Sequence, residues 1–201
     1  MGKLAFVFPG QGAQKVGMGK DFFDKYDLAK KRFQEADDAL GFDLRKLCFE
    51  GPEEDLRLTK NTQPAILTVS VIAGELLAEN GIEPEIVGGH SLGEYSALVL
   101  AGAMDFKDAV LLVHKRGGYM QEAVPVGIGS MAAILGLDND VIEAVCAEVK
   151  ELGSCEAVNF NCPGQTVIAG GAKAVEKAAE ILKEKGAGKV VTLGVSAPFH
   201  S

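Results

Sequence analysis

Cysteine and histidine are scarce in this sequence, and their spacing excludes the commonest metal-binding and redox motifs. Its 201 residues include four cysteines, at positions 48, 146, 155 and 162, which form no C-x-x-C pair and no zinc-ligand spacing. Three histidines are present. We therefore expect no metal site, no bound cofactor, and a reduced cytoplasmic protein whose thiols are buried or incidental.

The sequence also lacks long apolar runs and an excess of basic residues. No window approaches the run of about 18 apolar residues that a membrane span needs. The apolar stretch at 4–8 is too short for the core of a secretory signal. The formal net charge of −8 argues against nucleic acid as the main partner. These patterns exclude membrane and nucleic-acid roles as first hypotheses.

Nucleotide-binding fingerprints are missing from the loop where they would be expected. Residues 4–8 form a continuous apolar run, typical of a strand buried in a parallel sheet. The loop at 9–14 follows, but Lys15 stands where G-x-G-x-x-G needs its last glycine. Open α/β sheets bind ligands at such loops. Gln11 could present its backbone N–H or its side-chain amide there, or it could be only a polar turn residue.

Helical and strand patterns follow one another along the rest of the chain. Apolar spacing predicts two helices over 20–40 closed by Gly41, then helices over 44–49, 64–80, 95–104 and 106–122. Pro64 is expected to open the long helix and Gly81 to end it. Gly117 and Gly118, inside the last of these helices, suggest close packing or close approach of a ligand. A strand–helix–strand–strand–helix–strand order then fills 131–135, 140–152, 156–160, 166–169, 172–185 and 189–193.

This order predicts an α/β protein of two parts. Residues 1–124 are expected to form an α/β-hydrolase-like core with a parallel sheet, to which 196–201 return. Residues 125–195 read as an inserted ferredoxin-like βαββαβ subdomain. The first 124 residues supply two confident parallel strands, too few for a stable open sheet. We therefore expect the C-terminal part of the core to be missing and to lie beyond Ser201.

A strand, a glycine-rich turn and a helix surround Ser91. The motif G-x-S-x-G, typical of a nucleophile elbow, is matched by Gly89-His90-Ser91-Leu92-Gly93. Glycines at both flanks remove Cβ atoms that would collide with neighbouring backbone. The alternative is a capping box, S-x-x-E, in which Ser91 and Glu94 cap the following helix. The context favours the nucleophile, and the two roles partly exclude each other.

A serine nucleophile needs a base, and the histidine count narrows the choice. His90 is adjacent to Ser91, where neighbouring side chains point apart, and His114 lies in a helix beside Lys115. His200, after Pro198 in a turn-like stretch, remains the best candidate by elimination. The order of serine before histidine matches α/β-hydrolase-like arrangements.

The sequence alone does not decide which group orients the base or whether Arg116 binds a substrate. The third member of a triad could be any of Asp105, Asp108, Asp138 and Asp140, or a backbone carbonyl. Arg116 carries a planar guanidinium suited to gripping a carboxylate, but a helix arginine is more often solvated.

Five spaced motifs together resemble the malonyl-CoA:acyl-carrier-protein transacylases, acyltransferases of fatty-acid synthesis that are related to those of polyketide synthases. The resemblance runs from Leu4 to Ser201 in chain order. The motifs are Phe8-Pro9-Gly10-Gln11-Gly12-Ala13-Gln14, Thr62-Gln63-Pro64-Ala65, Gly89-His90-Ser91-Leu92-Gly93-Glu94-Tyr95, the helix of Arg116, and Ala197-Pro198-Phe199-His200.

The resemblance implies a role for each site residue. Ser91 would attack the malonyl thioester, and His200 would act as base and then as acid. The backbone N–H groups of Gln11 and Leu92 would form the oxyanion hole, and Arg116 would bind the malonyl carboxylate. The phenylalanine before the histidine would favour malonyl over methylmalonyl units, and its position is occupied by Phe199.

The same resemblance implies the partners and the orienting group of the base. Malonyl-CoA would be the donor substrate and acyl carrier protein the acceptor, with the protein acting as a monomer. In the family a backbone carbonyl from beyond the histidine orients the imidazole. Two alternatives remain: a serine hydrolase or thioesterase on the same scaffold, and a non-catalytic fragment that binds the carrier protein.

Overall fold

The computed structural model describes residues 3–124, 127–193 and 198–201. The chain divides into two compact units, residues 1–119 and 120–201, and each is described by itself. The predicted boundaries at 125 and 195, and residues 196 and 197 of the predicted return to the core, lie outside the described residues. The return of 196–201 to the first unit remains a prediction.

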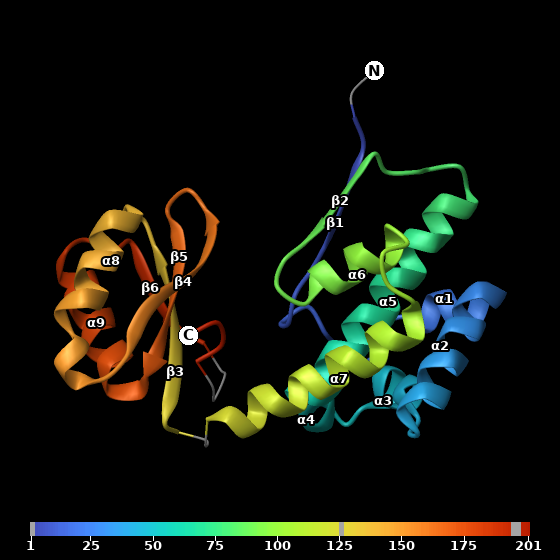
Figure 1. The fold of residues 1–201 in the computed structure, drawn as a ribbon, viewed down its shortest axis with the longest axis horizontal. Coiled ribbons are helices and arrows are strands. Elements are labelled where there is room, and N and C mark those ends of the chain that lie inside the picture. Colours follow the sequence, from blue (N-terminus) through green and yellow to red (C-terminus); the bar gives the residue numbers. More distant parts are fainter. Residues whose placement is uncertain (1–2, 125–126, 194–197) are drawn as a thin grey trace. The chain divides into compact units, whose positions relative to one another are not determined.

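Two parallel strands carry the site loops of the first unit. Strand β1 (Ala5–Phe8) pairs with β2 (Ile86–Gly89), and the last residues of the two strands are Cα partners (Figure 1). Parallel strands end at the same edge of a sheet, so the loops that carry Gln11 and Ser91 leave from one edge. The described part of the unit thus contains the two expected strands, and further strands beyond Ser201 remain a prediction.

Seven helices are described that begin in the first unit, and the last of them continues past its boundary. Their bounds are α1 (Lys20–Lys25), α2 (Asp27–Leu40), α3 (Leu44–Glu50), α4 (Glu53–Leu56), α5 (Thr59–Glu79), α6 (Gly93–Leu100) and α7 (Phe106–Ala123). Gly41 and Gly81 follow α2 and α5 in the left-handed conformation, which confirms both predicted ends. The short helix α4 was not predicted from the sequence.

Helix α5 begins five residues earlier than the sequence predicts. Pro64 was expected to open it, but the helix starts at Thr59 and encloses the proline. Proline lacks an N–H, so the carbonyl of Lys60 loses its partner four residues on. His114 Nδ1 lies 2.8 Å from that carbonyl oxygen and replaces the lost donor. Burial along α5 also stabilises the early turns, because the helix passes through the main core (residues such as Leu67, Val71 and Ile72).

The prediction of a buried helix over 95–104 is wrong at its C-terminal end. Helix α6 ends at Leu100, and residues 101–103 are exposed. Gly102 has a φ of 69°, and the N–H of Ala103 donates to the carbonyl of Leu98 at 3.0 Å. This bond pattern around a left-handed glycine stops a helix however apolar the sequence that follows.

The second unit is a four-stranded antiparallel sheet with two helices on one face (Figure 1). Its elements are β3 (Gly129–Leu135), α8 (Asn139–Glu148), a 3₁₀ turn (Lys150–Leu152), β4 (Cys155–Cys162), β5 (Gln165–Gly171), α9 (Ala172–Glu184) and β6 (Lys189–Thr192). The strand order across the sheet is β4-β5-β3-β6. The predicted βαββαβ order of elements is therefore confirmed.

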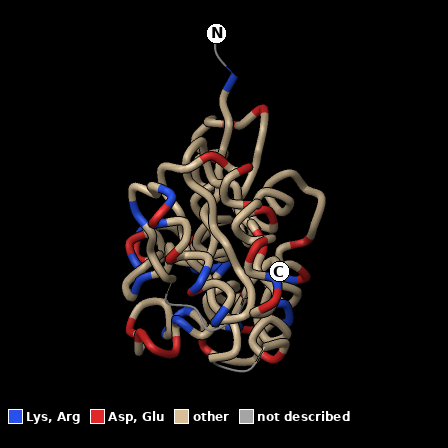
Figure 2. The backbone as a smooth tube through the Cα atoms, turned by 90° about the vertical axis from the view of Figure 1, so that its left-hand side faces the viewer, with Lys and Arg blue, Asp and Glu red and all other residues tan. Residues whose placement is uncertain are grey.

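Lys/Arg and Asp/Glu positions are interspersed along the described backbone (Figure 2). Several of these charges pair within one helix, as Lys20 does with Asp24 at 3.0 Å. Such exposed pairs contribute little stability each. Within the described ranges, no helix combines the length and the apolar character needed to cross a membrane.

Candidate active site

Ser91 lies in a tight turn between β2 and α6, with a φ of 51°. A Cβ on Gly89 would overlap the carbonyl group of Gly93, and a Cβ on Gly93 would overlap the carbonyl of Phe8 in β1. The turn can therefore close only because both flanking residues lack a side chain. This geometry confirms the expectation that the glycines prevent backbone collisions.

Ser91 lies two residues before Gly93, the first residue of α6. Its Oγ accepts a hydrogen bond of 3.3 Å from Nη2 of Arg116. The alternative of a capping box with Glu94 stays a prediction.

The elbow glycines give a stability prediction with a matched control. Gly89→Ala forces a methyl group into the backbone of Gly93, and we expect a loss of about 3 kcal/mol or more in the free energy of unfolding. Gly88→Ala, one residue earlier in the same strand, meets nothing within 4 Å and should change stability by less than about 0.5 kcal/mol. Urea denaturation followed by circular dichroism measures both. Equal stability of the two variants would contradict the packing argument.

Arg116 reaches from α7 into the space beside the elbow. Its Nη2 donates to Ser91 Oγ at 3.3 Å, and its Nη1 donates to Gln63 Oε1 at 2.7 Å. Its guanidinium carbon lies 5.6 Å from the centre of the Tyr95 ring, within the range of a cation–π contact. Three contacts from three elements hold this side chain, so it is not simply a solvated helix arginine. A fixed cation beside this serine is suited to binding an anionic group.

Two residues near Ser91 and Gln11 were given no role from the sequence: Gln63, which was quoted only as part of a motif, and Thr59. Gln63 is fully buried in α5 and accepts the hydrogen bond from Arg116. Thr59, also in α5, accepts a hydrogen bond of 3.2 Å from the side chain of Gln11. The signal was a glutamine beside Pro64, inside a helix whose other inward positions are mostly apolar. A buried amide in such a helix needs a polar partner.

The loop of Gln11 and the start of α6 lie against each other. A Cβ on Gly10 would come within 2.6 Å of the carbonyl oxygen of His90, so the loop packs directly on the elbow. The side chain of Gln11 is committed to Thr59, and Leu92, at the N-terminal end of α6, is buried. The first N–H groups of a helix favour negative charge near them. The oxyanion-hole roles of Gln11 and Leu92 follow as proposals below.

His90 and His114 have structural surroundings that fit the packing or turn roles expected of them. The backbone N–H of His90 donates to the carbonyl of Phe8 at 3.0 Å, which extends the strand pairing by one residue. The ring of His114 contacts the carbonyl of Lys60 and lies 5.7 Å from the ring of Phe42.

His200 and Phe199 belong to the second unit. Phe199 packs against a small apolar cluster around Met131 and Val167 on the sheet. His200 has a φ of 66°, and it and Ser91 are the two non-glycine residues of positive φ in the described ranges. Such conformations cluster at active sites because the surrounding structure must enforce them.

Metal-ligand clusters and reactive thiols do not define this site. The described residues contain no group of three or more His, Cys, Asp or Glu side chains that could hold a metal ion. Burial raises the pKa of the Cys48 thiol to about 12, so it stays protonated at neutral pH.

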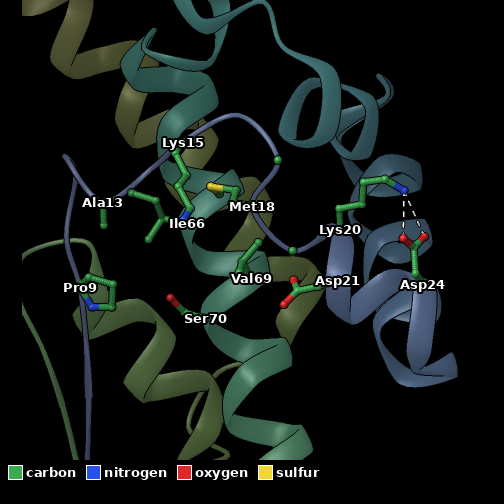
Figure 3. A pocket seen from close by; sticks show the side chains of 12 residues that line it. Pro9, Ala13, Lys15, Met18, Lys20, Asp21, Asp24, Ile66, Val69 and Ser70 are labelled. Atoms are coloured by element: carbon green, nitrogen blue, oxygen red, sulfur yellow. Dashed lines mark hydrogen bonds and ion pairs between the residues drawn. The ribbon is translucent and has the colours of Figure 1, made fainter.

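A pocket of about 610 Å³ lies beside the same loop (Figure 3). Its lining includes Pro9 and Ala13 from the loop and Ile66 and Val69 from α5, and it does not include Ser91.

Comparison with known proteins gives the family. Residues 5–201 match the family described as acyl transferase domain. The malonyl CoA-acyl carrier protein transacylase of Bacillus subtilis (strain 168) is 54% identical over 202 residues, which cover 100% of this chain and 64% of that protein. The acyl-carrier-protein S-malonyltransferase structure from Burkholderia pseudomallei 1710b matches with a TM-score of 0.95 at 55% identity, over 100% of this chain and 65% of that one.

A further solved structure is similar over nearly the same extent. A malonyl-transacylase in complex with its type II PKS acyl-carrier protein matches with a TM-score of 0.94 at 49% identity, over 98% of this chain and 64% of that one. The chain thus spans just under two thirds of the length of these relatives. Because the family match covers almost every residue, this chain belongs to the acyl transferase domain family.

Proposed function

We propose that this chain carries the acyl-accepting site of a malonyltransferase. Ser91 accepts a malonyl group from malonyl-CoA as an ester and passes it to the phosphopantetheine thiol of acyl carrier protein, in fatty-acid synthesis. The observation that carries the proposal is the distance of 3.3 Å between Arg116 Nη2 and Ser91 Oγ. The relatives named as malonyl transacylases support the same substrate and acceptor.

The reaction consists of two acyl transfers that share one base. His200 takes the proton of Ser91 as Oγ attacks the thioester carbonyl, and the C–S bond then breaks. The leaving CoA thiolate takes that proton from His200. The carrier-protein thiol next attacks the ester, and its proton passes through His200 back to Ser91 Oγ. This gives ping-pong kinetics with a covalent malonyl-enzyme intermediate.

Two backbone donors are proposed to stabilise each tetrahedral intermediate. The N–H groups of Leu92 and Gln11 lie on the helix start and on the loop that leave the same sheet edge. Removing one such donor typically lowers the rate by roughly 10²–10³. The orienting group of His200 is proposed to be a backbone carbonyl outside this chain, as the family resemblance implies.

Substrate choice is proposed to depend on Arg116 and Phe199. A malonyl ester on Ser91 places its free carboxylate only three bonds from Oγ, within reach of a guanidinium that already contacts that oxygen. The hydrogen bonds to Ser91 and Gln63 use two of the five N–H donors of Arg116. Phe199 is proposed to favour an unbranched malonyl group over a methylmalonyl group.

The finer architecture and the cellular setting are also proposals. We take the first unit as an α/β-hydrolase-like core and the second as a ferredoxin-like subdomain, whose βαββαβ order supports this description. A monomeric cytoplasmic protein is proposed, with malonyl-CoA and acyl carrier protein as its partners. Light scattering of the purified protein tests the monomer.

We expect Arg116→Ala to change which acyl group is transferred. Loss of a charged hydrogen-bond partner should lower kcat/KM for malonyl-CoA by about 10²-fold, while kcat/KM for acetyl-CoA stays within about threefold. Arg116→Lys keeps the charge but not the planar fork, and its kcat/KM for malonyl-CoA is expected to lie between those of the original protein and of Arg116→Ala. Steady-state transfer to carrier protein measures kcat/KM for all three proteins. An unchanged ratio of malonyl to acetyl transfer would refute the assigned role.

Intact-mass spectrometry separates transfer from the alternatives. A malonyl adduct on the Ser91 peptide that persists until carrier protein is added supports transfer. Rapid release of free malonate without an acceptor would instead indicate a hydrolase. No adduct and no labelling by a serine-directed acylating reagent would indicate a non-catalytic binding fragment.

A further inference from the structure

The carbonyl of Lys60 lacks the regular donor of an α-helix. In a regular α-helix it would accept a hydrogen bond from the N–H of the residue four positions later, but that residue is Pro64. A side chain from another helix can donate to this carbonyl in its place.

His114 supplies this donor from α7. Its Nδ1 lies 2.8 Å from the carbonyl oxygen of Lys60. A carbonyl oxygen only accepts, so Nδ1 donates in this bond. The ring also lies 5.7 Å from that of Phe42.

Gly117, one helical turn after His114, makes the second contact between these helices. A Cβ at this position would come within 2.6 Å of both Lys60 Cα and the Thr59 carbonyl oxygen. The next residue, Gly118, has nothing within 4 Å of its own Cβ position. The close approach is therefore specific to one face of α7. This short distance confirms the expected close packing at Gly117. His114 and Gly117 together fix the rotation of α7 about its axis and its position on α5.

Arg116 lies between these two contacts in the chain. Its guanidinium contacts Gln63 on α5 and Ser91 at the elbow. A small rotation of α7 would move the guanidinium at the end of its long side chain, and misplacement by about 1 Å can lower a rate by 10²-fold. We propose that His114 is a positioning residue, which holds Arg116 in register with Ser91 by anchoring α7 to the Lys60 carbonyl.

This inference rests on the proposed function, since it assigns His114 an effect on malonyl recognition. The test compares His114→Leu, which removes the donor, with His114→Asn, whose amide N–H takes the place of Nδ1–H. Each is made alone and combined with Arg116→Ala, and kcat/KM is measured with malonyl-CoA and with acetyl-CoA. If His114→Leu fails to fold, His114→Met, which also lacks a hydrogen-bond donor, replaces it.

We expect His114→Leu to lower kcat/KM for malonyl-CoA by about tenfold. The kcat/KM for acetyl-CoA should stay within about twofold of its original value. His114→Asn should retain most of the malonyl activity. In the Arg116→Ala background the effect of His114→Leu should vanish, because the two residues act through one contact. Equal losses for both thioesters, no rescue by asparagine, or an undiminished effect without Arg116 would each overturn the proposal.

Failure of the proposed function gives a different result. If Arg116→Ala alone leaves the malonyl preference unchanged, the carboxylate-binding role of Arg116 is refuted whatever the His114 variants do. If Arg116→Ala removes the preference but His114→Leu does not alter it, only the positioning role is refuted.

Discussion

Ser91→Ala is expected to abolish acyl transfer and to leave the fold intact. We expect kcat/KM to fall by at least about 10⁴-fold, because a covalent route cannot proceed without its nucleophile. Stability should change by less than about 1 kcal/mol, since alanine keeps the Cβ that serine already places at this φ. Transfer assays measure kcat/KM, and thermal unfolding measures the stability.

Ser96→Ala, in the helix that follows the turn, is a matched control. Ser96 is buried, and its hydroxyl has no hydrogen-bond partner among the described residues, so its removal should leave activity unchanged and cost no stability. The catalytic assignment would be refuted if Ser91→Ala retained more than about one hundredth of the activity. It would also be refuted if that variant lost stability but kept its rate.

His200→Ala is expected to have the second largest effect. Without a base, both acyl transfers should slow by about 10³- to 10⁴-fold. The other two histidines are poor substitutes, because the ring of His114 is bonded to the Lys60 carbonyl and His90 adjoins the nucleophile in a tight turn. Single-turnover formation of the malonyl-enzyme, followed by mass spectrometry, measures the first transfer directly.

Added imidazole distinguishes a base from a structural residue at position 200. It should restore part of the activity of His200→Ala, because it can occupy the vacated space and take the serine proton. Ser201→Ala, at the adjacent exposed position, is the control and should keep its full rate. Activity above about a tenth of the original in His200→Ala would refute the assignment.

Strong local patterns explain the parts of the fold that could be predicted. The alternation of strands and helices over 129–192 and the left-handed glycines after α2 and α5 follow from period and turn chemistry, which act within a few residues. The elbow glycines were also predictable, since a serine between two of them in this context needs a tight turn. Each of these features depends on neighbours in sequence.

Features that depend on distant partners were missed or misplaced. The early start of α5 is accompanied by a hydrogen bond from His114, which is 54 residues away from Lys60. The role of Gln63 depends on Arg116, 53 residues later. No local pattern reports such pairs. The candidate nucleophile was therefore visible in the sequence, whereas the hydrogen bonds that hold its neighbours were not.

The pairing of His114 with the Lys60 carbonyl also has a consequence for how this sequence can diverge. A residue other than proline at position 64 would donate its own N–H to that carbonyl. The hydrogen bond from His114 would then no longer be needed there. Conversely, in a chain that keeps Pro64, a side chain without a donor at position 114 leaves the Lys60 carbonyl without this hydrogen bond. Substitutions at these two positions are therefore expected to be epistatic.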